Sequence, residues 1–133
     1  MKILVIDNEP AMTELLKLLL AQTSPSVITA ENGKEGIRLV EEEQPDLVIL
    51  DLMMPEMDGK EVCREVRVFS QVPILILSAV DAPGKVAETL DAGADDYLIK
   101  PVSSVVLIAH INKLLRRLSP EWAQLCEARA ASQ

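Results

Sequence analysis

Four polar side chains that suit phosphate chemistry stand at the ends of short apolar runs. Asp7, Asp51, Ser78 and Lys100 each follow a run rich in Val, Ile and Leu, and long stretches of sequence separate them. Carboxylate oxygens bind hard cations such as Mg²⁺, and an ammonium group or a hydroxyl stabilises an anionic phosphoryl oxygen. Phosphoryl transfer needs this positioning and charge neutralisation more than it needs covalent chemistry. Each residue alone has an ordinary role as a cap or a solvated side chain, so their meaning depends on whether the fold brings them together.

The apolar runs predict five β-strands, which alternate with segments of helical spacing. The strands are expected at residues 2–6, 26–30, 46–50, 73–77 and 96–99. The helices are expected at residues 10–20, 33–43, from 59 onward, 83–92, and from 103 or 104 to 117. In the first helix, five apolar side chains recur at the spacing of one helix face: Met12, Leu15, Leu16, Leu19 and Leu20.

Strict alternation of strands and helices predicts a parallel sheet with helices on both faces, joined by right-handed crossovers. Apart from Asp46, the runs at 46–50 and 73–77 are continuously apolar, as expected of strands that are buried on both faces. Ligands of such a sheet bind at the carboxyl ends of the strands, and the four polar side chains stand there. We therefore predict a doubly wound α/β domain of five strands and five helices, with its functional site at that edge.

The bulk composition narrows the class of protein. A chain of 133 residues with 49% hydrophobic residues can bury a sizeable core and is not disordered. The apolar runs are too short to cross a bilayer, and the N-terminal one is too short for a signal peptide, so we expect a cytoplasmic protein without membrane binding. The net charge of −8 argues against direct nucleic-acid binding by this chain. Cys63 and Cys126 lack a CxxC spacing, which favours reduced structural thiols.

The pattern changes after the fifth predicted helix. Ser119 and Pro120 interrupt the helical spacing, and the segment beyond them carries Trp122 and Leu125 among alanine and polar residues. We predict one domain at residues 1–118, followed by a segment at 119–133. That segment is either a linker or an extra C-terminal helix, and the sequence leaves both open.

A nine-residue motif identifies a family. Residues 51–59, DLMMPEMDG, place Pro four positions and Gly eight positions after Asp51. Together with Leu77-Ser78-Ala79, residues 92–97 (AGADDY) and Lys100-Pro101, this motif resembles the receiver domains of two-component response regulators. The resemblance covers residues 2 to about 118, and its motifs occur in the family's order. It implies a flavodoxin-like sheet with the strand order 2-1-3-4-5.

The resemblance also implies a chemistry for the strand ends. Asp51 would be the phosphoacceptor, phosphorylated by a sensor histidine kinase or a small phosphodonor. Ser78 and Lys100 would bind the phosphoryl oxygens, with Ala79 small enough to leave them room, and Tyr97 would turn inward as Ser78 moves toward the phosphate. The Lys100–Pro101 bond is expected to be cis. The domain would be a signalling switch that catalyses its own phosphorylation and dephosphorylation, not an enzyme acting on a separate substrate.

The metal site departs from the family pattern. The resemblance implies Mg²⁺, or Mn²⁺ in its place, held by Asp7, Asn8, Asp51 and the backbone carbonyl of Met53. Receivers normally carry two adjacent acids after the first strand, and here the pair is Asp7-Asn8. Asparagine offers a carbonyl oxygen but no charge, which could cost on the order of a few kcal/mol of metal binding at an effective dielectric near 20. We predict weaker metal binding and slower phosphorylation.

The output surface is expected on the fourth helix, fifth strand and fifth helix. The chain is similar to the subclass of receivers that are fused to winged-helix DNA-binding domains, which implies transcription regulation and a homodimer through this face. Val106 and His110 stand where that subclass tends to have an acid and an arginine. Four charged residues could still form part of an intersubunit network: Lys85, Asp91, Asp96 and Arg117.

Two other functions compete with this hypothesis. A pseudo-receiver would signal without phosphorylation; Asn8 favours it, whereas Asp51, Ser78 and Lys100 oppose it. An α/β enzyme that binds a nucleotide or flavin is disfavoured because no GxGxxG follows the first strand and no P-loop is present. An aspartate-based phosphatase would need an acid where Met53 stands.

Overall fold

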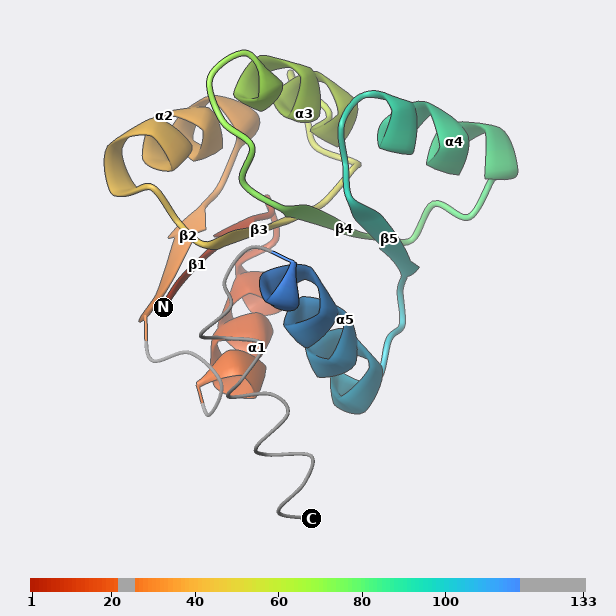
Figure 1. Ribbon diagram of the computed structural model, residues 1–133. Helices are drawn as coiled ribbons and strands as arrows, with labels where there is room; N and C mark the ends of the chain where they lie inside the picture. The colour runs from red at the N-terminus through yellow and green to blue at the C-terminus, as the bar shows by residue number, and fades with distance from the viewer. Residues whose placement is uncertain (22–25, 118–133) are drawn as a thin grey trace.

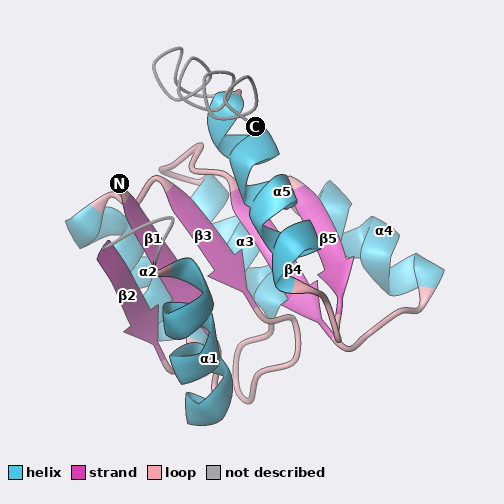
Figure 2. Cartoon of the chain, turned by 90° about the horizontal axis from the view of Figure 1, so that it is seen from below, coloured by secondary structure: helices cyan, strands magenta, loops and turns pink. Residues whose placement is uncertain are grey.

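The computed structural model describes residues 1–21 and 26–117, which form one three-layer α/β domain. The sheet is parallel, in the order β2-β1-β3-β4-β5, as predicted. Its strands are β1 (Lys2–Ile6), β2 (Ser26–Ala30), β3 (Leu47–Leu50), β4 (Ile74–Ser78) and β5 (Asp96–Ile99). The helices are α1 (Pro10–Leu20), α2 (Gly33–Glu43), α3 (Gly59–Arg67), α4 (Pro83–Asp91) and α5 (Ser104–Arg116). Helices α2, α3 and α4 cover one face of the sheet, and α1 and α5 cover the other (Figures 1 and 2).

The predicted elements are confirmed, with bounds that differ by about one residue. Strand β3 begins one residue later than predicted, and β4 is shifted by one so that Ser78 is its last residue. Ser103 is the N-cap of α5, where its hydroxyl accepts a hydrogen bond from the Val106 N–H at 3.2 Å. The predictions for residues 119–133, and for Cys126, fall outside the described residues; Cys63 is a buried free thiol.

The central strands are apolar throughout because helices cover both faces of the sheet. Successive side chains of a strand point to opposite faces, so Ile3 and Val5 of β1 pack toward α1 and α5, whereas Leu4 and Ile6 pack toward α2 and α3. The side chains of β1 from Ile3 onward, and those of β3, are 1% exposed or less. This burial makes the sheet a rigid base for the loops at its carboxyl edge.

The predicted apolar face of α1 is only partly buried. Leu15 belongs to that face, but it is 48% exposed, whereas the polar Thr13 is buried. Helix α1 contacts the sheet through a narrow stripe centred on Leu16 and Leu20. A pocket of about 420 Å³ lies between α1 and α5, and Leu15 is one of the residues that line it.

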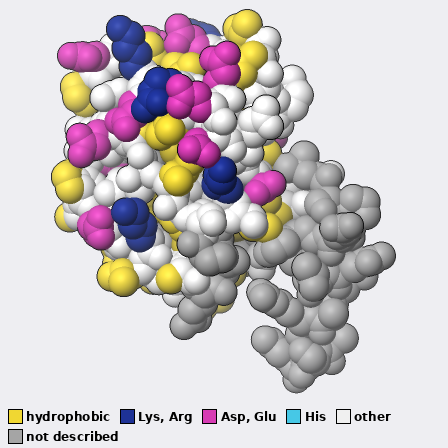
Figure 3. All heavy atoms as spheres, turned by 90° about the vertical axis from the view of Figure 1, so that its left-hand side faces the viewer, with side chains coloured by type: hydrophobic (Ala, Val, Ile, Leu, Met, Phe, Trp, Pro, Cys, Tyr) yellow, Lys and Arg dark blue, Asp and Glu magenta, His cyan; other side chains and the backbone are white. Residues whose placement is uncertain are grey.

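None of the helices in the described part of the chain is long and apolar enough to cross a membrane. On the face in Figure 3, acidic and basic side chains are interspersed, with separate apolar ones between them. That face therefore presents no basic patch of the kind that binds phosphate backbones.

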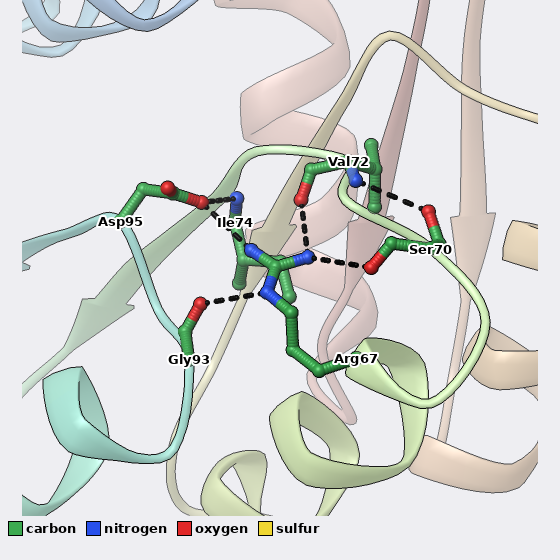
Figure 4. A network of polar contacts seen from close by, with 6 residues as sticks. All are labelled: Arg67, Ser70, Val72, Ile74, Gly93 and Asp95. Carbon is green, nitrogen blue, oxygen red and sulfur yellow. Dashed lines mark hydrogen bonds and ion pairs between the residues drawn. The ribbon is translucent and has the colours of Figure 1, made fainter.

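Arg67, at the end of α3, connects the loops at the amino edge of the sheet (Figure 4). Its guanidinium donates to the carbonyl oxygens of Gly93 at 3.0 Å, Ser70 at 3.2 Å and Val72 at 2.7 Å, and to the Asp95 carboxylate at 2.8 Å. The same carboxylate accepts from the N–H of Ile74, the first residue of β4, at 2.8 Å. One side chain thus holds the segments that lead into β4 and β5.

Gly93 is required by this arrangement for two reasons. Its φ is 124°, a conformation that side chains with a Cβ rarely adopt, and an added Cβ would lie 2.7 Å from Cγ of Arg67. We expect Gly93→Ala to lower the free energy of unfolding by about 1–3 kcal/mol. Gly84→Ala, in α4, is the matched control, because nothing lies within 4 Å of its added Cβ, and it should be neutral or slightly stabilising. Urea denaturation measures both, and equal effects would contradict this account.

Candidate phosphoryl-transfer site

The carboxyl edge of the sheet brings three of the predicted residues together. Asp7 follows β1, Asp51 follows β3 and Lys100 follows β5. The Lys100 ammonium lies 3.4 Å from Oδ2 of Asp7 and 3.9 Å from Oδ2 of Asp51. Both carboxylates are nearly buried, with Asp7 3% and Asp51 7% exposed. A pair of anions with one cation therefore lies in a largely enclosed site.

Backbone hydrogen bonds hold each of these residues in place by extending the sheet past its strands. The Asp7 N–H donates to the carbonyl of Ala30 at 3.1 Å, and the Asp51 N–H donates to the carbonyl of Ile6 at 3.0 Å. The Lys100 N–H donates to the carbonyl of Ser78 at 2.8 Å, and the Lys100–Pro101 peptide bond is cis, as predicted. These hydrogen bonds thus fix the backbone of the three site residues to the sheet.

The loop after Asp51 is packed so closely that it needs the glycine of the motif. An added Cβ on Gly59 would lie 2.8 Å from the backbone oxygen of Asp51 and 2.8 Å from Cα of Leu52. The Gly59 N–H donates to the Leu52 carbonyl at 2.9 Å, which joins the start of α3 to the residue after Asp51. Asp58 caps α3 by accepting from the Glu61 N–H at 3.0 Å. The spacing of the motif therefore has a direct structural cause.

Burial raises the pKa of Asp51, because a carboxylate loses hydration in the enclosed site. The Asp7 carboxylate, and to a lesser degree Glu9, raises this pKa further. The Lys100 ammonium and the Met53 N–H, which donates to Oδ1 of Asp51 at 3.3 Å, oppose the shift. The site thus holds the ionised Asp51 at a cost that an added cation would reduce.

Ser78 and Tyr97 meet at the loop that follows β4. Ser78 is fully buried, and its hydroxyl accepts from the Val80 N–H at 3.2 Å. The Tyr97 hydroxyl donates to the Val80 carbonyl at 2.6 Å, so its ring packs against the same loop. No sequence pattern predicts this role of Val80, because the group that bonds to Tyr97 is a backbone carbonyl.

The remaining predicted metal ligands lie at the same edge but are open to solvent. Asn8 follows Asp7 and is exposed, and the Met53 side chain is 64% exposed. In residues 1–21 and 26–117, no three His, Cys, Asp or Glu side chains are grouped so that they could hold a metal ion. A Mg²⁺ here would rely on the carboxylates of Asp7 and Asp51, with neutral oxygens of Asn8 and Met53 completing a hard-oxygen set that suits this ion.

The doubly wound parallel sheet thus carries a buried carboxylate pair and a lysine at its carboxyl edge, which is the edge where such sheets bind their ligands. The chain belongs to the family of response regulator receiver domains, whose model matches residues 3–112. It is the receiver domain of a two-component response regulator.

Relatives and solved structures agree with this family. The chain is 44% identical over 121 residues to the response regulator MprA of Mycolicibacterium vanbaalenii, covering 90% of this chain and 52% of that protein. It is 43% identical over 115 residues to the transcriptional regulatory protein AfsQ1 of Streptomyces coelicolor, covering 86% and 51%. A two-component response regulator from Clostridium difficile superposes with a TM-score of 0.85 at 30% identity, covering 89% and 98% of the two chains. The chain spans about half the length of the curated relatives it matches.

The pKa shift of Asp51 predicts how its neutralisation changes stability. Because its pKa is higher in the folded state, the stability that Asp51 contributes is full below its unfolded pKa and is lost as the pH rises through the folded pKa. In metal-free buffer at pH 7, Asp51→Asn should therefore unfold at higher urea concentration than the unsubstituted chain. The difference should vanish as the pH falls below the ordinary range of an aspartate. Asp81→Asn, an exposed acid, is the control and should change stability little at either pH.

Proposed function

We propose that Asp51 accepts a phosphoryl group from the phosphohistidine of a sensor kinase, or from a small phosphodonor, in a reaction that requires Mg²⁺. The observation that carries the proposal is the contact of one lysine with two buried carboxylates, Asp7 and Asp51. An oxygen of Asp51 attacks phosphorus as the bond from phosphorus to the donor nitrogen breaks, and the donor histidine, which is protonated on its other ring nitrogen, leaves as neutral imidazole. The product is an acyl phosphate, which water later hydrolyses to regenerate the carboxylate.

The chain's own residues supply positioning and charge. The N–H of Met53 holds Oδ1 of Asp51, which leaves Oδ2 on the side of Lys100 as the attacking oxygen. Lys100 then offers its ammonium to the phosphoryl oxygens, and the Ser78 hydroxyl donates a hydrogen bond to them. When bound, Mg²⁺ neutralises charge on the transferring group. The residues that would hold it are Asp7, Asp51, Asn8 and the carbonyl of Met53.

The switch in this proposal is the loop between Ser78 and Val80. Ser78 would leave the Val80 N–H as its hydroxyl turns to the phosphoryl group, which changes the loop that Tyr97 contacts. Phosphorylation acts by favouring an arrangement already accessible to the domain. The surface that reads this change would be α4, β5 and α5.

A homodimer through that face belongs to the same proposal, but its contacts would differ from a charged network. Asp96 is already bound within the chain, to Nδ1 of His110 at 2.5 Å and to Nζ of Lys113 at 3.4 Å. Apolar side chains are partly exposed nearby, with Ile99 at 45% and Val106 at 42%. Sizing with and without beryllofluoride tests the dimer, and a monomer in both states would exclude it.

Phosphorylation itself is the test of the proposed function. Incubation with acetyl phosphate and Mg²⁺ should give a phosphoryl adduct by intact mass. The adduct should disappear in Asp51→Asn, because the attacking oxygen is replaced, and should persist in the control Asp81→Asn. The unsubstituted chain should also give no adduct in EDTA. No adduct under any condition would favour a receiver that signals without phosphorylation.

The charge at position 8 should set the affinity for Mg²⁺. Asn8→Asp adds a carboxylate beside Asp7, and we expect Mg²⁺ to bind about tenfold more tightly, since part of the Coulomb gain is lost to repulsion and desolvation. Calorimetric titration measures the affinity, and the rate of adduct formation should rise at limiting Mg²⁺. Gln71→Glu, an exposed position at the amino edge of the sheet, adds the same charge away from the site. An unchanged Mg²⁺ affinity in Asn8→Asp would show that asparagine at position 8 does not weaken metal binding.

A further inference from the structure

Helix α4 is held to the rest of the domain by few interactions. Thr89 is its only buried residue. The Thr89 hydroxyl donates within the same helix, to the carbonyl of Lys85 at 2.7 Å, so it makes no polar link to another element. Helix α4 packs beside α3 and β5 at one end of the sheet (Figure 1). A polar contact that links α4 to a neighbouring element is therefore important for holding α4 in place.

An ion pair between helices supplies this link. The ammonium of Lys60, in α3, lies 3.4 Å from Oε2 of Glu88, in α4. Lys85 approaches the same oxygen at 3.8 Å, but it belongs to α4 and cannot join that helix to another element. The Lys60 side chain is 23% exposed and the Glu88 side chain is 54% exposed, so water screens this pair mainly from the side of Glu88.

Both partners oppose the dipole of their own helix. Lys60 is in the first turn of α3, where the positive end of the helix favours acids. Glu88 is in the last turn of α4, where the negative end favours bases. Neither residue is favoured by the dipole of its own helix, and each lies 3.4 Å from an opposite charge on the other helix. Such a local conflict is expected where a contact between elements, and not the element itself, determines the residue.

The ion pair borders the phosphoryl-transfer site. A hollow of about 80 Å³ is lined by Lys60, Lys85 and Glu88 together with Leu52, Met53 and Val80. Leu52 and Met53 follow Asp51 directly, and Val80 accepts the hydrogen bond of the Tyr97 hydroxyl. The lysines of this hollow therefore share it with the two residues that follow Asp51, the carboxylate on which a phosphoryl charge would appear.

We propose that the Lys60–Glu88 ion pair fastens α4 to α3 while Asp51 is unphosphorylated, and that the phosphoryl charge releases α4 by drawing Lys60 toward Asp51. The second half rests on the proposed function of Asp51. A phosphoryl group adds roughly two negative charges, which compete with the single carboxylate of Glu88 for the ammonium of Lys60. The release exposes the α3-facing side of a helix that buries little else.

Amide hydrogen exchange of residues 86–91 tests the fastening in the full chain, at a concentration where all variants share one oligomeric state. Glu88→Gln should speed this exchange about two- to fivefold. Asp91→Asn is the matched control: Asp91 is exposed, in the same helix, and makes no ion pair within the described residues. It removes the same charge and relieves the same unfavourable interaction with the helix dipole, so it should leave the exchange unchanged or slower.

Lys60→Met should speed the exchange as much as Glu88→Gln does, and the double variant should exchange no faster than either single variant. Equal effects of Glu88→Gln and Asp91→Asn, or additive effects of Lys60→Met and Glu88→Gln, would overturn the ion pair as the fastening.

Beryllofluoride tests the release. It should speed exchange in α4 of the unsubstituted chain and add little in Glu88→Gln, where α4 is already free. An equal increment in both would overturn the release, as would beryllofluoride that binds without changing the exchange of α4. Binding is verified separately by fluorine NMR, with Asp51→Asn as the blank. If beryllofluoride does not bind, the proposed function of Asp51 fails and the release with it, while the coupling of Lys60 to Glu88 is still measured.

Discussion

The contact of Lys100 with Asp7 and Asp51 is the interaction on which the site depends. Two like charges that are buried side by side repel each other, and without a cation one of them would take up a proton. Lys100 reaches both because β5 ends at the same edge as β1 and β3, although β4 lies between β3 and β5. The pairing of Ser78 with Ile99, and the bond from the Lys100 N–H to the Ser78 carbonyl, fix the position of this lysine. The charge balance of the site thus depends on the strand order of the sheet.

Asn8 affects this charge balance as well as the affinity for the metal. With Asp7 and Asp51 ionised, the site has two negative charges and one positive charge, and an acid at position 8 would add a third negative charge. Asparagine keeps an oxygen at that position without increasing the repulsion between the buried carboxylates. Because asparagine is uncharged, it reduces the repulsion between negative charges in the absence of metal. For the same reason it leaves less negative charge to attract Mg²⁺. Stability of the empty site and affinity for the metal are therefore opposed at this residue.

Much of the fold and the site could be predicted because they depend on local patterns. Continuous apolar runs marked β3 and β4, and the alternation of elements placed Asp7, Asp51 and Lys100 at one edge before any contact was known. What the sequence could not provide depends on packing between distant segments. Leu15 lines a pocket between α1 and α5, the link from Tyr97 to Val80 uses a backbone carbonyl, and the four hydrogen bonds of Arg67 join loops that no periodicity connects.

Residues that conflict with their local surroundings gather near the phosphoryl-transfer site. Asp51 is a carboxylate that its burial disfavours, and Lys60 and Glu88 carry the wrong sign for their helix ends. At the amino edge of the sheet, by contrast, the charges of Arg67 and Asp95 satisfy each other and the surrounding backbone groups. A fully satisfied network has one favoured arrangement, whereas charges that oppose their local surroundings can be rebalanced by a single new anion or cation. The domain thus combines an amino edge that fixes the strands with a carboxyl edge where a change of charge can shift the structure.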